Sequence, residues 1–522
     1  MASGFVIRKN QYYDSVFLMG ISKRISEAKG VQQNAVLMGS DNNKELLSNI
    51  GIQDPQIDIA RPNDLIVVVI ADTPQIVSNV LDKLDEYFQG GLQGSPPSNL
   101  HSFEDGLSQK PGANLVTISV PGEYAAREAR KALESGLNVF LFSDNVSIHD
   151  ELDLKTFAAK NNLLLMGPDC GSSLIDGVGI GFTNVVRKGS IGVISAAGSG
   201  LQEFTCQVHN AGFGISHALG TGGRDLSDEI GGLTTLSALE ALEADPMTKA
   251  ITLISKPPGP RTITKLSERL KICKKPVVGC FLGMKNELDV GPSFQSARLI
   301  DDAVRLAIAQ IDDRSLSSLF QFTPQELAWM NRETASWSSQ QKYVRGLFAG
   351  GTFCYQCQQI FQDAGLPVYS NVPLDPDYKL IDPDLSNEHT LVDMGDDHYT
   401  VGKPHPMIDG TMRIQRLLVE SQDPNVAVLL LDFILGYNAS MDPVGEHLRA
   451  IMDAKQTAQK RGGALTVVAS ICGTEDDPQD LSLQTRMLEQ NGVIVFPSNA
   501  KAARFCCNLF KQRLGDDHAD QS

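Results

Sequence analysis

Short runs of Val, Ile and Leu recur along most of the 522-residue chain, and segments of helical character separate them. Such runs are typical of parallel strands that are buried on both faces, with connecting helices covering the sheet. The clearest runs are Leu65–Ile70, Leu115–Val120, Asn138–Phe142, Leu163–Gly167, Gly192–Ser195, Ala250–Ile254, Pro276–Phe281, Val426–Asp432, Leu465–Ser470 and Gly492–Phe496. We therefore expect an α/β protein with several doubly wound parallel sheets, Rossmann-like or flavodoxin-like, and a small N-terminal α/β domain.

The first 89 residues carry a strand and helix pattern of their own. Ser15–Met19 and Asn34–Met38 are predicted strands with a helix between them, and Leu65–Ile70 is a third, fully buried strand. The pair Thr73-Pro74 is typical of a helix start, so a helix is expected from there to about Tyr87. These elements predict a small α/β domain, with a split-βαβ arrangement as a candidate topology.

Three segments interrupt the strand and helix alternation. Gly90–Gly112 is rich in Gly, Pro and Ser without apolar periodicity, which predicts an exposed, mobile linker. Residues 315–342 are polar and predict a helical connector, with a capped helix starting at Thr323, and residues 512–522 predict a polar tail that frays from Gly515. The α/β regions between these segments are expected to form one domain each, over residues 113–188, 189–314 and 343–511.

The chain is acidic, because 62 Asp and Glu residues outnumber 45 Lys and Arg residues and give a formal charge of −17. With no basic run, such a chain is a poor partner for nucleic acid or an anionic membrane, and neither is expected. The apolar runs are far shorter than the roughly 20 residues that span a bilayer, and no signal-peptide pattern opens the sequence. The nine cysteines are irregularly spaced, which predicts free thiols and a cytoplasmic location.

Several predicted strands end in turns of small and hydroxyl-bearing residues that lead into a helix. In a doubly wound sheet, ligands bind at these strand ends, and free amides at a helix N-terminus stabilise an anion. The residues expected to bind phosphate or another small anion are Ser195, Gly198, Ser199, Gly200, Gly222, Gly223, Gly350, Gly351 and Thr352. Similar turns follow at Phe433–Asn438 and Cys472–Pro478. Any one turn is also typical of a tight strand–helix connection, so the prediction depends on their recurrence.

Other polar residues leave alternatives open. Cys354 and Cys357 form an isolated Cys-x-x-Cys, which is either a redox pair or a structural feature. His405 lies between two prolines in a polar stretch, Asp393–Tyr399 and Gly402–Asp409, that is either a surface loop or a substrate or inter-domain site. The histidines and cysteines form no spaced ligand set, so no metal is expected. A Walker sequence is absent, and no Gly-x-Gly-x-x-Gly opens the first βαβ unit, so a nucleotide cofactor is unsupported.

Two ordered sets of motifs cover most of the chain. The first set is Met166–Gly171, Gly189–Gly200, Asn210–Ser216, Gly220–Asp225, Glu243–Ile251 and Lys275–Gly279, and the second is Leu391–Gly395, Asp423–Leu431 and Phe433–Gly436. The first set resembles the α subunit of succinyl-CoA synthetase, and the second is similar to the C-terminal domain of its β subunit. An α-like half joined to a β-like half, behind an additional N-terminal domain, resembles the FdrA family. This resemblance implies a CoA-binding-like Rossmann domain over residues 113–188 and flavodoxin-like ligase domains over residues 189–314 and 343–511.

The resemblance has two departures. Succinyl-CoA synthetases carry a phosphorylated histidine, whereas the corresponding stretch Gly283–Ala297 has no histidine, so the covalent phosphoryl relay is missing. The ATP-grasp half of the β subunit is also absent, as is the glycine-rich loop of the CoA domain, so CoA or ATP binding is unsupported and no cofactor is certain. What remains is a scaffold whose helix N-termini bind anions, with Ser195 and Gly198–Gly200 where the phosphohistidine docks in the relatives.

Resemblance to the FdrA family implies a subunit of an oxamate carbamoyltransferase in allantoin and purine nitrogen catabolism. Such an enzyme converts oxalurate and phosphate to oxamate and carbamoyl phosphate, which are small anions that helix N-termini can hold. Arg224 or Lys256 is a candidate to neutralise developing charge, and His405 is a further catalytic candidate. The expected partners are other subunits of the enzyme and further copies of the chain. The alternatives are an ADP-forming acyl-CoA synthetase and a scaffold without activity.

Overall fold

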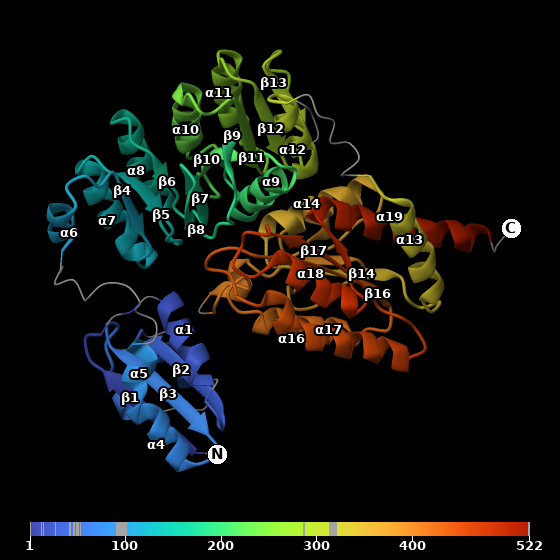
Figure 1. Cartoon of the computed structure of the whole chain (residues 1–522), viewed down its shortest axis with the longest axis horizontal. Helices are drawn as coiled ribbons and strands as arrows, with labels where there is room; N and C mark the ends of the chain where they lie inside the picture. The colour runs from blue at the N-terminus through green and yellow to red at the C-terminus, as the bar shows by residue number, and fades with distance from the viewer. Residues whose placement is uncertain are drawn as a thin grey trace. The chain divides into compact units, whose positions relative to one another are not determined.

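The structure is a computed structural model that describes residues 2–11, 13, 15–26, 28–40, 43–44, 47–48, 52, 54–89, 102–284, 288–312, 321–401 and 403–519. Contacts divide the chain into an N-terminal unit, Met1–Ala113, and a C-terminal unit, Asn114–Ser522. Figure 1 shows the N-terminal unit mainly in blue, and the C-terminal unit in cyan through red.

The described strands of the N-terminal unit form one antiparallel sheet. Its elements are β1 (Ala2–Arg8), α1 (Ser15–Ser26), β2 (Val31–Met38), α3 (Pro55–Asp58), β3 (Leu65–Ala71), α4 (Pro74–Asp82), α5 (Leu84–Gln89) and α6 (Phe103–Gln109). The order is β1-β3-β2, with β3 antiparallel to both neighbours. Strand β3 is thus inserted between β1 and β2, which α1 connects, and this is the split-βαβ arrangement that the sequence suggested. As expected, Thr73 caps α4 by accepting a hydrogen bond from Ile76 N at 3.4 Å.

Three expectations for this unit need correction. The strand predicted at Ser15–Met19 is wrong, because these residues begin helix α1. An apolar run this short suits either element, and here Ile21 and Ile25 continue it at helical spacing as one fully buried face. Strand β1 was not predicted. Helix α6 lies inside the predicted linker, without buried side chains, whereas residues 90–101 lie outside the described residues.

The C-terminal unit begins with a small parallel sheet. Its elements are β4 (Leu115–Ile118), α7 (Gly122–Glu134), β5 (Asn138–Leu141), α8 (Ile148–Lys160) and β6 (Leu165–Met166), with strand order β4-β5-β6. An unpredicted hairpin follows, made of β7 (Ser172–Ile175) and β8 (Val178–Gly181). Strand β7 pairs antiparallel with β10 (Ile215–Gly220), so the hairpin carries the predicted range 113–188 into the next sheet.

That next sheet has seven described strands in the order β13-β12-β11-β9-β10-β7-β8. Its remaining elements are β9 (Lys188–Ser195), α9 (Gly198–Asn210), α10 (Leu233–Ala244), β11 (Ala250–Ser255), α11 (Pro260–Lys271), β12 (Val277–Phe281), β13 (Phe294–Ala297) and α12 (Ile300–Ala309). Strands β9 to β13 are parallel, as expected for β9, β11 and β12, whereas β10 and β13 were not predicted, and the hairpin adds an antiparallel edge.

A five-stranded parallel sheet completes the unit, in the order β15-β14-β16-β17-β18. Its elements are α13 (Pro324–Ser336), β14 (Tyr343–Phe348), α14 (Gly351–Asp363), the 3-10 helix η2 (Pro376–Tyr378), β15 (Thr390–Asp393), α15 (Asp397–Thr400), α16 (Thr411–Glu420), β16 (Val426–Ile434), α17 (Pro443–Lys460), β17 (Thr466–Cys472), α18 (Leu481–Gln490), β18 (Ile494–Phe496) and α19 (Asn499–Ala519). Thr323 caps α13 as expected, in a capping box with Glu326. The tail predicted to fray from Gly515 is instead helical as far as Ala519. None of the helices in the described residues is long and apolar enough to cross a membrane.

The two larger sheets share one topology. When their parallel strands are numbered along the chain, both have the order 2-1-3-4-5, which is the flavodoxin-like order. In each sheet the first strand leads through a two-residue turn into a helix, from Ser195 to Gly198 for α9 and from Phe348 to Gly351 for α14. Ligands of such sheets bind between the first and third strands. These are β9 and β11 in one sheet, and β14 and β16 in the other.

Buried hydrogen bonds join the helices of these two sheets reciprocally. Gln356 Oε1, on α14, accepts a hydrogen bond from Ile300 N at 2.9 Å, at the start of α12. Glu203 Oε1, on α9, accepts one from Asn499 N at 3.0 Å, at the start of α19. Because Glu203 and Gln356 are each the sixth residue of their helices, the two halves are related by approximate two-fold symmetry.

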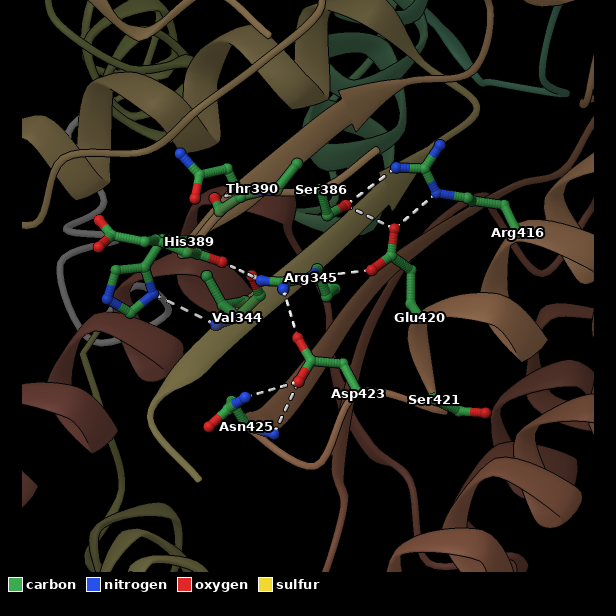
Figure 2. A network of polar contacts seen from close by, with 12 residues as sticks. Val344, Arg345, Ser386, His389, Thr390, Arg416, Glu420, Ser421, Asp423 and Asn425 are labelled. Atoms are coloured by element: carbon green, nitrogen blue, oxygen red, sulfur yellow. Dashed lines mark hydrogen bonds and ion pairs between the residues drawn. The ribbon is translucent and has the colours of Figure 1, made fainter. Parts of the chain in front are cut away.

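A buried charged network holds the N-terminal end of β14 (Figure 2). Arg345 pairs with Glu420 and Asp423, each at 2.8 Å, and donates a hydrogen bond to the Glu388 carbonyl. Further contacts to the two carboxylates come from Arg416, Ser386 and Asn425. The network therefore fixes the segment that leads into β15.

Candidate functional site

The N-termini of α9 and α14 meet where the two larger sheets pack together. Ser199 Oγ, on α9, accepts a hydrogen bond from Thr352 N, on α14, at 3.4 Å. A methyl group added to Gly200 would lie 3.0 Å from Thr352 Cγ2, and one added to Gly350 would lie 2.9 Å from Ser199 Cβ. Both glycines therefore permit the close approach. The structure thus brings together two of the predicted anion-binding turns, which lie far apart in the sequence.

The α9 end of this site is open. Gly198 is exposed, and the nearest atom to a methyl group placed there would be Ser172 Oγ, at 3.5 Å. Ser195 is buried, and its Oγ is used inside the turn, where it accepts a hydrogen bond from Ala197 N at 3.0 Å. Ser195 therefore shapes the turn, and no side chain in the described residues caps α9. The amides of its first helical turn remain for a ligand.

The α14 end is held by a buried ion pair. The Asp432 carboxylate accepts hydrogen bonds from Ala349 N at 2.8 Å and from Gly350 N at 2.9 Å. Arg413 Nη2 lies 3.1 Å from Asp432 Oδ1, and both side chains are buried. The Gly350 amide, which was expected to bind an anion, is thus already bonded to a carboxylate.

Asp393, at the end of β15, faces the start of α14. A methyl group on Gly351 would lie 2.5 Å from Asp393 Oδ2, so the carboxyl group packs directly on this glycine. Burial raises the pKa of Asp393 to about 7, although Gly395 N donates a hydrogen bond to Oδ1 at 2.9 Å. The sequence indicated Asp393 only as part of the polar stretch that is either a surface loop or a substrate or inter-domain site, and gave it no chemical role of its own. Its position at a strand end, within that polar stretch, is the signal that could have indicated one.

His405 lies beside the same loop. A methyl group on Gly395 would lie 2.7 Å from His405 Nε2, 3.1 Å from Ala349 O and 3.2 Å from Asp393 Oδ1. These three atoms therefore lie close together around Gly395. His405 Nδ1 accepts a hydrogen bond from Met407 N at 3.2 Å, which places the proton of the neutral ring on Nε2. Because burial lowers the pKa of His405 to about 4, the ring is neutral near pH 7. The centroid of the His405 ring lies 6.3 Å from that of Phe182, which follows β8, so the His405 loop contacts the other half of the unit.

Lys256 brings a positive charge to the site from the other sheet. It directly follows β11 and is exposed, and its Nζ lies 5.1 Å from the centroid of the Tyr355 ring on α14. Its charge also favours the ionised form of Asp393. A cation near the start of α14 adds to the attraction of the site for an anion.

The other predicted anion-binding residues lie at a neighbouring strand end. Arg224 pairs with Glu151 of α8 at 2.9 Å. A methyl group on Gly222 would lie 2.2 Å from Pro168 O, and Gly223 lies beside the next residue of the same loop. The Arg224 side chain and this glycine turn therefore pack the three-stranded sheet against the seven-stranded one.

The turns at Phe433–Asn438 and Cys472–Pro478 join the two halves. Tyr437 N donates a hydrogen bond to Thr183 O at 2.8 Å, and Asp477 Oδ2 accepts one from Asn184 Nδ2 at 2.7 Å. Both partners follow the β7–β8 hairpin. These turns thus have a structural role.

Cys354 and Cys357 lie inside α14, and both side chains are completely buried. Burial raises the pKa of each thiol above its ordinary value, so both are protonated near pH 7. A protonated, inaccessible thiol is a poor nucleophile. The structure favours the structural interpretation of this pair.

Comparisons with known proteins agree with this architecture. A family model described as CoA-ligase matches residues 347–508, and one described as AllF, heavy metal-associated domain, matches residues 1–98. The uncharacterized protein YahF of Escherichia coli (strain K12) is 42% identical over 516 residues, which are 97% of this chain and 99% of YahF. The α subunit of the ADP-forming succinate–CoA ligase of Methanothermobacter thermautotrophicus is 28% identical over 169 residues, 32% of this chain and 56% of that subunit. The corresponding subunit of Aquifex aeolicus (strain VF5) is 31% identical over 202 residues, 38% of this chain and 65% of that subunit.

The fold and the joined helix N-termini define an α/β protein of the acyl-CoA synthetase type. Its two flavodoxin-like sheets correspond to an α-subunit-like half and a CoA-ligase half. Because the similarity to YahF extends over nearly the whole of both proteins, the chain belongs to the FdrA family.

The N-terminal unit does not fit the heavy metal that its domain description implies. Residues 1–98 contain neither cysteine nor histidine, and these are the ligands that soft transition metals prefer. Within the part of the chain that the structure describes, no three His, Cys, Asp or Glu side chains are placed to share a metal ion. Asp64 illustrates the alternative use of carboxylates here, because it accepts hydrogen bonds from the backbone N of Asn10 and of Arg61.

Proposed function

We propose that the chain is a subunit of an oxamate carbamoyltransferase, which converts oxalurate and phosphate to oxamate and carbamoyl phosphate. The observation that supports this proposal best is the joint site at the N-termini of α9 and α14, with Lys256 beside it. The site suits small anions, and Gly283–Ala297 lacks the histidine that a phosphoryl relay requires. Membership of the FdrA family supports the same assignment.

In the proposed reaction, phosphate oxygens bind to the free amides of the first turn of α9, next to the Ser199 hydroxyl. The phosphate then attacks the carbamoyl carbon of oxalurate directly. Fixed backbone dipoles hold the charge without a covalent enzyme intermediate, and the neighbouring Lys256 ammonium balances charge that develops on the carbamoyl oxygen. Binding oxalurate and phosphate side by side is the main contribution of the chain.

We also propose that the chain assembles with partner subunits and with copies of itself. The assembled enzyme would act in allantoin-derived nitrogen catabolism in the cytoplasm. The test is to co-express the chain with its partner subunits, purify the assembly, and measure carbamoyl phosphate and oxamate formed from oxalurate. We expect cleavage that requires phosphate, and none from the chain alone. An assembly that leaves oxalurate intact at every phosphate concentration would refute the assignment.

An ADP-forming acyl-CoA synthetase is the second candidate, because the chain is similar to succinate–CoA ligase α subunits and because His405 brings an imidazole to the site. Such an enzyme needs a phosphorylated residue. His405 Nε2 is a poor acceptor in this geometry, because it packs on Gly395 and no space separates them for a phosphoryl group.

Radiolabelled ATP and inorganic phosphate, each with CoA, distinguish the two candidates. The carbamoyltransferase proposal predicts that the purified assembly acquires no acid-labile label. Stable labelling that disappears in His405→Asn would instead establish a phosphohistidine and the ligase reaction.

A further inference from the structure

The approximate two-fold symmetry of the site allows its two ends to be compared residue by residue. Ser195 and Phe348 are equivalent, because each lies three positions before the first residue of α9 or α14. Ser195 pairs with Gly220 on one neighbouring strand and with Ile254 on the other. Phe348 pairs with Asp393 on the strand equivalent to that of Gly220.

On the other side of the first strand lie β11 in one sheet and β16 in the other. Leu347 pairs with Leu431, so the position equivalent to Ile254 is that of the next residue, Asp432. The two positions that flank the start of α9 are thus Gly220 and Ile254, which carry no charge. The two equivalent positions at α14 are aspartates.

This asymmetry gives the two helix N-termini different properties. At α14, Asp432 accepts the amides of Ala349 and Gly350, and Asp393 packs on Gly351, so carboxyl groups already occupy the place of an anion. At α9 no carboxylate takes the equivalent positions, and Gly198 is exposed. A dianion such as phosphate is therefore attracted to α9 and repelled from α14.

We infer that the α9 end binds the phosphate dianion, and that Asp393 at the α14 end is the general acid that protonates the departing amide nitrogen of the substrate. This inference rests on the proposed carbamoyl transfer. The acid is placed by β15, the phosphate by α9, and the contact between Ser199 and Thr352 joins the two ends.

The proton balance of the reaction requires such a group. A phosphate oxygen bonds to the carbamoyl carbon, and the bond from that carbon to the amide nitrogen breaks. The nitrogen leaves with the proton of the Asp393 carboxyl group, which gives neutral oxamate amide rather than a very basic amide anion. Asp393 then recovers a proton from the hydrogenphosphate that has become carbamoyl phosphate, so no external acid is consumed.

The surroundings of Asp393 keep part of it protonated near neutrality. Burial raises its pKa to about 7, Asp396 and Asp432 act in the same direction, and the Gly395 amide and Lys256 oppose them. The neutral ring of His405 also faces the group. A carboxyl group with a pKa near the working pH is suited to give and recover a proton in each turnover.

The test compares Asp393→Asn with Asp409→Asn in the assembled enzyme. Asparagine keeps an oxygen that can accept the Gly395 amide, so the loop should keep its form. Asp409 is exposed and accepts a hydrogen bond from Thr411 N, which asparagine can also accept, so it is a matched control. Asp393→Asn should lower kcat by about 100-fold or more, whereas Asp409→Asn should change it less than threefold.

Three further measurements separate general-acid catalysis from a structural role. Asp393→Asn should keep its affinity for inorganic phosphate, or gain affinity, because a negative charge is removed. Asp393→Glu should recover part of the lost kcat. The fall of wild-type kcat above about pH 7, expected from the titration of this acid, should be absent from the residual activity of Asp393→Asn.

The inference is overturned if Asp393→Asn retains kcat within threefold, or if its phosphate affinity falls together with kcat. A wild-type assembly without oxalurate cleavage would instead refute the proposed function. Phosphate binding by the full-length chain is measured separately, so the two failures are distinguishable.

Discussion

Ser199 and Thr352 are the second residues of two equivalent helices, and Ser199 Oγ accepts a hydrogen bond from Thr352 N at 3.4 Å. The contact shows that the site belongs to neither half alone. Each half supplies one helix N-terminus at the switch point of its own sheet.

A negative charge at the open end of α9 should abolish phosphate binding. Gly198→Glu places a carboxylate where the anion is expected, so the KM for phosphate should rise by about 100-fold or more in the assembled enzyme. Gly198→Ala is the matched control, because its methyl group would lie 3.5 Å from Ser172 Oγ and fits without a clash. Unchanged kinetics in Gly198→Glu would show that the anion binds elsewhere.

Lys256 should contribute to anion affinity rather than to stability. Removing one charge-assisted contact costs about 1.5–3 kcal/mol, so Lys256→Met should weaken phosphate binding by roughly tenfold or more. Lys249→Met removes an exposed lysine at the opposite end of β11 and should leave the affinity unchanged. Isothermal titration with phosphate measures both variants. Equal affinities would remove Lys256 from the site.

Arg345 should be among the residues most important for the stability of the five-stranded sheet. Arg345→Met leaves the buried Glu420 carboxylate with Arg416 as its remaining ion-pair partner, so the cost should approach but not exceed the about 3–5 kcal/mol of a buried charge left unpaired. Urea unfolding followed by tryptophan fluorescence reports on this region, because the two tryptophans are Trp329 on α13 and Trp337, whose Nε1 donates to Thr466 Oγ1 at 2.9 Å. Lys342→Met, at an exposed neighbouring site, should change the midpoint little. If Arg345→Met unfolded at the same urea concentration as Lys342→Met, the network would contribute little to stability.

Glu203 should make stability depend on pH. Burial raises its pKa to about 7, above the ordinary 4.5, so the folded chain binds a proton that the unfolded chain has already lost. The contribution of Glu203 to the free energy of unfolding is therefore fully present below about pH 4.5 and is lost as the pH rises to about 7. Glu203→Gln keeps the oxygen that accepts Asn499 N and should unfold at a higher urea concentration than wild type at pH 8, with a smaller difference at pH 5.

The exposed Glu240 on α10 provides the control for this experiment, because Glu240→Gln removes the same charge without burial. It should show the pH dependence of the wild type. A Glu203→Gln variant with an unchanged pH profile would contradict a protonated Glu203 in the folded state.

The parallel sheets could be predicted from the sequence because buried strands are continuous apolar runs, as in Val426–Asp432 and Leu465–Ser470. The same criterion failed at Ser15–Met19, where a short apolar run belongs to a helix. It also missed the hairpin of β7 and β8, because strands of four residues with Gly and Ser have little periodic character.

The glycine turns of α9 and α14 were predicted, but their contact was not, because the packing of two sheets is set by side chains far apart in sequence. A specific role for Asp393 was not predicted for the same reason. An aspartate at the end of a strand has no distinguishing local pattern, and its raised pKa arises mainly from burial in the folded chain. Arg224 had a suitable local pattern, and yet a carboxylate of α8 binds it.

The reciprocal bonds of Gln356 to α12 and of Glu203 to α19 have a consequence for how the molecule is built. In a ligase assembled from separate polypeptides, the two halves can be synthesised in unequal amounts and exchanged. Here both halves are present on one polypeptide in a fixed one-to-one ratio, and each completes the helix ends of the other. A cut in the connector between α12 and α13 should therefore yield fragments that remain associated under native conditions, as a nicked but whole protein.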